Sequence, residues 1–406
     1  MGGSQGFEGL LTPSKITAWL DCGHYLTLKH QVENGTRQRP DLPFGSFARL
    51  LMEKGLAHEA AVLESYRARG CNVVEVEDRD RRNHETFAAW AERSAPLLSS
   101  DADVLFQMPF VHDGIRGIAD FLERVVDSDG TVRWEPVDAK LARTAAKPGH
   151  VLQLCFYAEA IEALTGVTPV DLKVSLGSGR TETVRFDDVR PYWSRLRSQV
   201  RAAMDADHDD ASTRPEPCDH CDFCEFAPDC EQTWRQADSL VYVAGIRSTE
   251  RKALEADGVD TLALLAERTA EVGDLRPERL SRLRTQASLQ VEARESEEAA
   301  KPPFLLIDPN DDEPVWGHGF EQLPEPDPGD IFLDFEGHPF WRPDRGLFFL
   351  FGYIAADDTA EWRFEQLWAH DETEEAARVE ELVGYIAARR AEHPGMHVYH
   401  YNHTER

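Results

Sequence analysis

One stretch decides the fold: Trp134-Glu135-Pro136-Val137-Asp138-Ala139-Lys140. Successive side chains of a β-strand point to opposite faces, so the carboxylate of Asp138 and the ammonium group of Lys140 lie on the same side. An acid and an amine at this spacing can share one site. The stretch therefore predicts a strand that carries chemistry on one face.

Two further strand-like segments precede this stretch and form a three-stranded meander with it. Residues 103–111 and 115–126 are separated by a turn at Asp113-Gly114, and a turn at Asp129-Gly130 leads into residues 131–139. Asp-Gly between two runs of apolar residues is typical of a hairpin. We expect the three segments to pair in sequence order.

Helical spacing surrounds the meander. Apolar residues recur with helical period at about 44–69 and at 150–164, and another hairpin is expected over 172–186, followed by a helix. The order helix, sheet, helix, sheet, helix predicts an α/β fold.

A second acid lies on the strand before Asp138. Asp120 shares a face with Arg116 and Ile118, and from there it can approach Asp138 across the sheet. Two carboxylates can hold a hard divalent cation such as Mg²⁺ or Mn²⁺, which lowers the pKa of bound water. Lys140 would orient that water or stabilise developing charge.

Three helical residues are further candidates. His58 is a possible additional metal ligand, and Gln153 and Tyr157, at i and i+4, present their polar ends on one helix face. Taken singly, each feature has an ordinary alternative: a solvated strand edge, a hydrogen-bonded histidine or a half-buried helix face. Their order along the chain favours the site.

These residues resemble the motifs of the RecB-like branch of the PD-(D/E)XK nucleases, which have a restriction-endonuclease-like core. The resemblance implies that His58, Asp120 and Asp138 bind the metals, that Lys140 assists hydrolysis, and that Gln153 and Tyr157 contact DNA. The four motifs are Gly55-Leu56-Ala57-His58-Glu59, Gly117-Ile118-Ala119-Asp120, Val137-Asp138-Ala139-Lys140 and Gln153 to Tyr157.

Four of the seven cysteines lie between Cys218 and Cys230. Thiolates this close in sequence can enclose a structural zinc ion, and an odd number of cysteines argues against a disulfide framework. The chain also resembles RecB-like nucleases with an iron–sulfur cluster. That resemblance implies a [4Fe-4S] cluster held by Cys22, Cys221, Cys224 and Cys230, with zinc as the alternative. Cys218 is then surplus.

The resemblance also implies a division of the whole chain. We expect a RecB-like nuclease domain with the cysteine cluster over 1–236, a small all-helical module over 237–294 and a linker rich in proline and acidic residues over 295–330. Residues 243–246 of the module faintly resemble a helix-hairpin-helix motif. The remaining part, 331–406, has the element order of an RNase H-like fold.

Asp334 and Glu336 lie on one face of the first strand of this last part, so they form a second possible metal site. They resemble the first motif of DEDD-type 3′–5′ exonucleases, and residues 400–405 resemble the start of the second. The later elements of that fold are missing, so we expect the RNase H-like domain to be incomplete. Chains of this kind often continue into a superfamily I helicase, which implies a helicase domain or subunit as partner.

The composition limits how the chain can bind nucleic acid. The chain has 406 residues, 41% of them apolar, and 44 basic against 74 acidic residues give a net charge of −30. Such a surface repels nucleic acid, so binding needs a local basic patch or a metal. Arg133, Lys140, Arg143 and Lys147 could supply the patch.

No membrane span or signal peptide is visible, and we expect a cytoplasmic protein. The sequence therefore predicts a Mg²⁺- or Mn²⁺-dependent deoxyribonuclease. We expect an exonuclease that acts on DNA ends or single strands in DNA repair or recombination, with RNA left open as a substrate. The alternative is a non-catalytic nucleic-acid-binding scaffold stapled by zinc.

Overall fold

The computed structural model describes residues 11–40, 46–205, 213–295, 301–306, 323–357 and 359–401. The chain forms two compact units. The first consists of residues 1–38, 43–213 and 326–406, and the second of residues 39–42 and 214–325. Among the described helices, none has the length and apolar character needed to cross a membrane.

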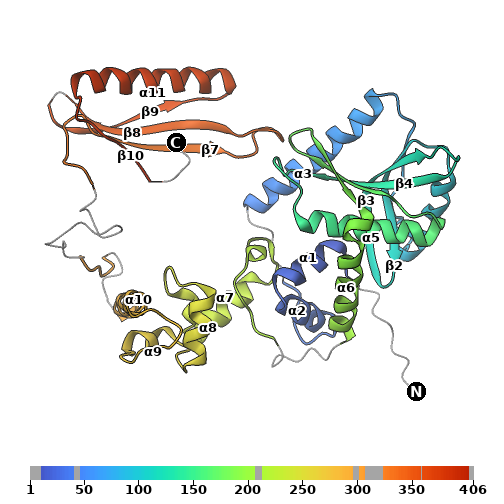
Figure 1. Cartoon of the computed structure of the whole chain (residues 1–406), viewed down its shortest axis with the longest axis horizontal. Coiled ribbons are helices and arrows are strands. Elements are labelled where there is room, and N and C mark those ends of the chain that lie inside the picture. Colours follow the sequence, from blue (N-terminus) through green and yellow to red (C-terminus); the bar gives the residue numbers. More distant parts are fainter. Residues whose placement is uncertain are drawn as a thin grey trace. The chain divides into compact units, whose positions relative to one another are not determined.

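A six-stranded sheet forms the centre of the first unit (Figure 1). Its strands lie in sequence order, with β1 parallel to β2, β4 parallel to β5, and every other pair antiparallel. The strands are β1 (Val73–Glu75), β2 (Val104–His112), β3 (Ile115–Val126), β4 (Val132–Lys140), β5 (Asp171–Leu176) and β6 (Thr181–Arg185). The predicted meander is confirmed as β2–β3–β4.

The two predicted meander turns are tight because glycine supplies a left-handed residue at each. Gly114 has a φ of 76° and Gly130 a φ of 87°, which residues with a side chain rarely adopt. Asp113 takes a φ of 50° beside Gly114, as expected of an Asp-Gly hairpin turn. Local turn chemistry therefore sets the register of β3 against both neighbours.

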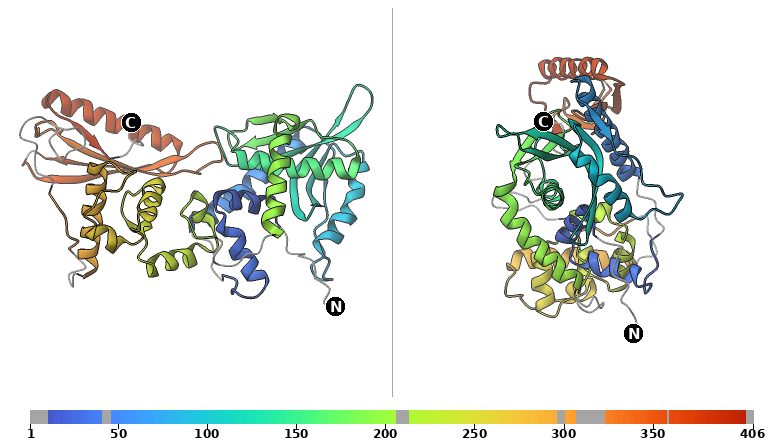
Figure 2. Two further views of the ribbon diagram at one scale, coloured as in Figure 1. Left: turned by 60° about the horizontal axis from the view of Figure 1, so that its bottom comes forward. Right: turned by 90° about the vertical axis from the view of Figure 1, so that its right-hand side faces the viewer.

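Helices cover both faces of this sheet. Figure 2 shows α3 (Ser46–Ala68) and α5 (Pro148–Thr165) on opposite sides of the strands. Leu63 and Tyr66 of α3 pack on the sheet in one apolar cluster. Both helices end at a left-handed glycine, Gly70 and Gly166. The other helices of this region are α1 (Pro13–Asp21), α2 (His24–Glu33), α4 (Phe87–Ser94), the 3₁₀ turn η1 (Ala95–Ser99) and α6 (Phe186–Asp205).

The second unit is helical. It contains η2 (Asp219–Phe223), α7 (Ala227–Gln236), η3 (Leu240–Tyr242), α8 (Ser248–Ala256), α9 (Leu262–Glu267) and α10 (Pro277–Glu295). Leu240, Leu254, Leu262 and Leu283 are fully or almost fully buried together and form its core. The helical module expected from the sequence thus has an apolar core of its own.

A second sheet lies near the end of the chain. Its order is β10–β7–β8–β9, with β10 parallel to β7, and α11 lies along one face (Figure 1). Its elements are β7 (Ile331–His338), β8 (Leu347–Ala356), β9 (Trp362–Trp368), α11 (Glu372–Glu392) and β10 (Val398–His400). Three strands, a helix and a fourth strand are the elements that the sequence predicts.

Candidate active site

The predicted pair of acids, Asp120 and Asp138, meets where β3 and β4 diverge. The ladder between these strands ends at the pair Phe121 and Val137. Beyond it, the Oδ2 atom of Asp120 accepts a 2.9 Å hydrogen bond from the backbone amide of Ala139. Burial raises the pKa of Asp120 well above its usual range, and the adjacent Asp138 carboxylate raises it further. The acids are thus held close together in a poorly hydrated place.

Lys140 is paired with Asp138, as the alternation of the strand predicts. Its Nζ atom lies 2.9 Å from Oδ1 and 2.8 Å from Oδ2 of Asp138. Burial by itself would lower the pKa of Lys140, but the carboxylates of Asp138 and Asp120 outweigh it and the pKa is raised. The lysine is therefore a cation at neutral pH and partly offsets the two acids.

Glu59 on α3 is a third acid at this place, and the sequence analysis missed it. Burial raises its pKa. The nearby Lys140 cation lowers this pKa in part, and the Asp138 carboxylate raises it. The side-chain amide of Gln107 donates a hydrogen bond to the Glu59 carboxylate. Gln107 itself has a φ of 61°, which is rare for a residue with a side chain. A strained strand residue is thus used to hold an acid beside Asp120.

His58 precedes Glu59 on α3, and its side chain reaches β5, the strand next to β4. The side chain is buried, and its Nε2 atom lies 3.1 Å from the carbonyl oxygen of Ser175 on β5. A carbonyl oxygen only accepts, so Nε2 is the donor, and in the neutral ring the lone pair then lies on Nδ1. This tautomer would suit a ligand whose outer nitrogen is fixed by a backbone carbonyl.

Tyr157 is buried, and its hydroxyl group donates a 2.6 Å hydrogen bond to the carbonyl oxygen of Ile118. A Cβ atom on Gly117 would lie 2.9 Å from the Tyr157 ring, so only glycine leaves room for it. Tyr157 therefore fixes the strand two residues before Asp120. Gln153, one turn earlier, is half-buried, and no hydrogen bond joins its side chain to the described residues.

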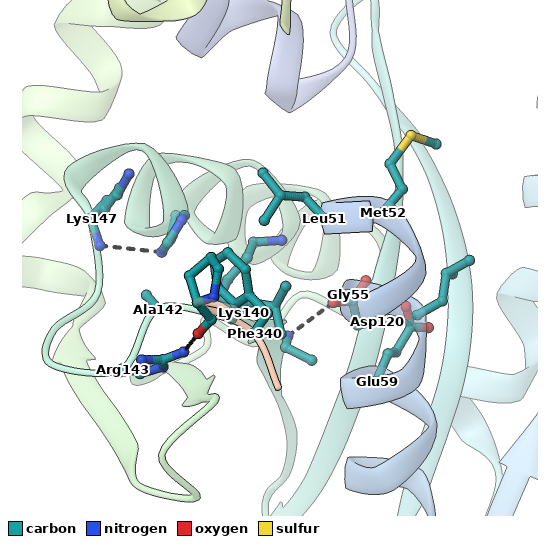
Figure 3. Close-up of a pocket in the computed structure, with 15 residues that line it drawn as sticks. Leu51, Met52, Gly55, Glu59, Asp120, Lys140, Ala142, Arg143, Lys147 and Phe340 are labelled. Atoms are coloured by element: carbon teal, nitrogen blue, oxygen red, sulfur yellow. Dashed lines mark hydrogen bonds between the residues drawn. The ribbon is translucent and has the colours of Figure 1, made fainter. Parts of the chain in front are cut away.

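Glu59, Asp120 and Lys140 line a pocket of about 780 Å³. Figure 3 shows Glu59 and Asp120 on one side, Arg143 and Lys147 on the other, and Lys140 between them. Of the basic residues expected here, Arg133 is committed elsewhere, since it pairs with Asp127 and with Glu135. One wall of the pocket is thus acidic and the other basic.

His150, at the start of α5, is a second residue that the sequence analysis missed. It lines the pocket, and its Nδ1 atom accepts a 3.2 Å hydrogen bond from the backbone amide of Lys147. That bond leaves the proton on Nε2. Burial, with Lys140 as the next cause, lowers the pKa of His150 to about 4. The imidazole is therefore a neutral hydrogen-bond donor at pH 7.

The donor set fits a hard divalent cation in part. Within the described ranges, no three His, Cys, Asp or Glu side chains are arranged closely enough to hold a metal ion. The Oδ2 atom of Asp138, however, is buried and accepts no hydrogen bond of good geometry, although Lys140 Nζ is near. A buried carboxylate oxygen of this kind, beside a second carboxylate, matches the ligands that Mg²⁺ and Mn²⁺ prefer.

The cysteines expected to hold a cluster lie in different units. Cys22 follows α1 in the first unit, whereas Cys221, Cys224 and Cys230 belong to the second. Within the second unit, the sulfur atoms of Cys218 and Cys221 are 3.9 Å apart. No disulfide joins any of the seven cysteines, all of which are described. The ligand set stays a prediction.

Asp334 and Glu336 lie on the exposed face of β7, opposite Gly352 and Leu350 of β8. No ion pair joins either acid to another described residue, and no third metal-ligating side chain accompanies them there. The expected second motif over 400–405 lies outside the described residues from Asn402 onward. The second metal site therefore also stays a prediction.

The chain matches a family of known proteins. Residues 11–231, more than half of the chain, match the family described as the PD-(D/E)XK nuclease superfamily. A search of the curated proteins found no match. The matched span covers the six-stranded sheet with Asp120, Asp138 and Lys140, and it ends just after Cys230.

Proposed function

Because the chain belongs to the PD-(D/E)XK nuclease superfamily, we propose that it is a metal-dependent nuclease that hydrolyses phosphodiester bonds of DNA. The observation that carries the proposal is the joint position of Asp120, Asp138 and Lys140 beside one pocket. Two carboxylates and an amine at the point where two strands diverge can bind a cation, a phosphate group and water together.

Asp120 and Asp138 are the proposed ligands of Mg²⁺ or Mn²⁺, with Glu59 and the Nδ1 atom of His58 as further candidates. When bound, the cation would neutralise the phosphodiester and lower the pKa of a water molecule. Lys140, a cation held against Asp138, would orient the attacking water or stabilise the negative charge that develops on the phosphate oxygens. The Nε2–H group of His150 would donate a hydrogen bond to a phosphate oxygen without adding a charge.

Tyr157 is proposed as a positioning residue. Its hydroxyl group is committed to the Ile118 carbonyl oxygen, so it acts on the site by holding the strand that carries Asp120. The half-buried Gln153 is the better candidate for a contact with DNA. The resemblance implies that both residues contact DNA. The buried hydrogen bond of Tyr157 favours a positioning role for Tyr157 and a DNA contact for Gln153.

The finer assignments rest on the resemblance. We propose exonuclease action on DNA ends or single strands in repair, a [4Fe-4S] cluster on Cys22, Cys221, Cys224 and Cys230, and an RNase H-like part from residue 331. The four-part domain division and a helicase as partner belong to the same proposal. The order β10–β7–β8–β9 with parallel β10 supports the RNase H-like assignment.

The alternative function is a zinc-stapled scaffold that binds nucleic acid without cleaving it. The observation that favours zinc is the 3.9 Å separation of the Cys218 and Cys221 sulfur atoms, because two thiolates on one tetrahedral zinc ion lie at a similar distance. A nuclease assay on labelled DNA with and without Mg²⁺ separates the two functions. The nuclease requires metal-dependent cleavage that Lys140→Ala greatly slows, whereas the scaffold predicts binding without cleavage.

A further inference from the structure

A second pocket, of about 410 Å³, lies in the nuclease fold between the loop before α4 and the β2–β3 hairpin. Its lining includes Arg79 and Arg81 from the loop, Arg116 from β3, and the first residues of α4. None of these residues takes part in the proposed catalysis. The pocket is therefore a concave basic surface that needs an explanation of its own.

Within the described ranges, the three arginines have no acidic partner. No ion pair joins Arg79, Arg81 or Arg116 to another described residue, and the Nε atom of Arg79 is buried without a hydrogen-bond partner. Arg116 instead lies over the ring of Phe87, 5.3 Å from its centroid. Gathering like charges in one pocket is unfavourable unless an anion joins them. With 74 acidic residues in the chain, such an arrangement does not follow from composition.

The nearest acids are committed to other partners. Asp80 accepts hydrogen bonds from the backbone amides of Arg82 and Asn83, and side-chain and backbone bonds from Asn83 lower its pKa. Glu85 lines the pocket but accepts from Arg93 Nε at 2.9 Å and from the Asp80 amide at 2.8 Å. These acids hold the loop in place, and the pocket keeps a net positive charge.

The start of α4 adds donors to the same pocket. Thr86 caps the helix. Its hydroxyl oxygen accepts a hydrogen bond from the amide of Ala89, and its carbonyl oxygen accepts one from the amide of Trp90. The amides of Phe87 and Ala88, which line the pocket, find no acceptor among the described residues. Free amides at a helix start, together with the helix dipole, favour an anion.

We propose that this pocket binds a phosphate group of the nucleic-acid strand that the nuclease cleaves. The inference rests on the proposed function for the identity of the substrate. Arginine forks and helix-start amides both match the tetrahedral oxygens of phosphate. Arg116 and Asp120 stand four residues apart on β3, or about 13 Å along the strand, a distance that a few nucleotides span. A strand held here would thus extend toward Asp120.

The test is the equilibrium binding of labelled single-stranded DNA to the full chain in EDTA, at several salt concentrations. The test variant is Arg81→Gln/Arg116→Gln. The control is Arg82→Gln, which removes the same charge from the same loop but does not line the pocket. We expect affinity to fall on the order of tenfold at 0.1 M salt, and the salt dependence to weaken by about 0.7 per lost contact. The control should bind like the parent.

The single variant Arg81→Glu separates a loss of binding from a loss of folding, because Arg81 is exposed and its replacement should not disturb the fold. This variant should lose DNA affinity while its Tm stays unchanged. The proposal is wrong if both test variants bind DNA like the control. It is also wrong if inorganic phosphate shifts the Tm of the parent but not of the double variant while DNA affinity is equal in both, because the pocket would then serve free phosphate. DNA binding that depends on the pocket without any cleavage would refute the nuclease, and with it the identity of the bound strand as a substrate, but it would support the pocket as a phosphate site for DNA.

Discussion

The hydroxyl group of Tyr157 on α5 donates a 2.6 Å hydrogen bond to the carbonyl oxygen of Ile118 on β3. The ring above that bond fits only because residue 117 is glycine. A helix and a strand are thereby locked together two residues before Asp120, at the point where β3 separates from β4. The geometry of the two acids depends on this contact between sheet and helix.

Tyr157→Phe removes the hydroxyl group and leaves the ring. We expect a loss of about 1 kcal/mol of stability, as for one buried hydrogen bond, and slower cleavage because Asp120 is held less firmly. Tyr66→Phe is the matched control, since it removes a buried tyrosine hydroxyl bonded to Glu123 away from the pocket. Thermal unfolding and cleavage rates check this. Equal cleavage by the two variants would contradict a positioning role for Tyr157.

Two substitutions separate the two nitrogen atoms of His150. Asn at this position keeps an acceptor for the Lys147 amide and loses the outer donor, whereas Gln keeps a donor at the place of Nε2 and loses the acceptor. We expect His150→Asn to keep its Tm and lower kcat/KM on the order of tenfold. His150→Gln should lose about 1 kcal/mol of stability and keep more activity. The reverse pattern would mean that His150 acts only on the helix start.

The Asp120 carboxyl should make the metal-free protein less stable as pH rises. Its pKa is raised in the folded state, so the stability it contributes is complete below about pH 4 and is lost as pH rises through the raised pKa. Asp120→Asn mimics the protonated form and can still accept from Ala139, so it should raise the Tm above neutral pH. Asp129→Asn is the control of opposite sign, because hydrogen bonds from Thr131 lower the pKa of Asp129. The measurement is urea unfolding in EDTA at pH 5 and at pH 8. The prediction is wrong if Asp120→Asn is no more stable than the parent at pH 8.

The cysteine prediction is checked by colour and metal content. Anaerobically purified protein should absorb broadly across the visible range and contain iron, and Cys224→Ser should lose both. Cys71→Ser is the control, since Cys71 packs beside an apolar cluster of the first unit. Colourless protein that contains zinc would replace the iron–sulfur cluster with the zinc alternative.

Sequence reasoning reached the meander and the pairing of Asp138 with Lys140 because both follow from local rules: Asp-Gly turns and alternation along a strand. It missed Glu59 because adjacent helix residues point about 100° apart, and only the packing of α3 shows that both residues reach the sheet, His58 at Ser175 and Glu59 at Gln107. The left-handed Gln107 carries no sequence signal. Arg133 was expected near the pocket, although its odd spacing from Asp138 already places it on the other face of β4.

His150 could have been found. It stands three residues before Gln153, which is one helical turn, and a histidine at the third position of a helix can accept from the chain before it. The basic pocket could not, because Arg79 and Arg116 come together only through the packing of the loop before α4 against the β2–β3 hairpin. Local patterns thus pointed to Asp120 and Asp138 as a pair, and tertiary packing decides what surrounds them.

The central claim is that Asp120 and Asp138 together hold a catalytic cation. The most direct measurement is cleavage of labelled single-stranded DNA by the parent and by Asp138→Asn, with Mg²⁺, with Mn²⁺ and with EDTA, beside Asp129→Asn as control. We expect the parent and the control to cleave DNA only with metal, and Asp138→Asn to lose at least about a hundredfold in rate. Cleavage by Asp138→Asn at the parental rate would contradict it.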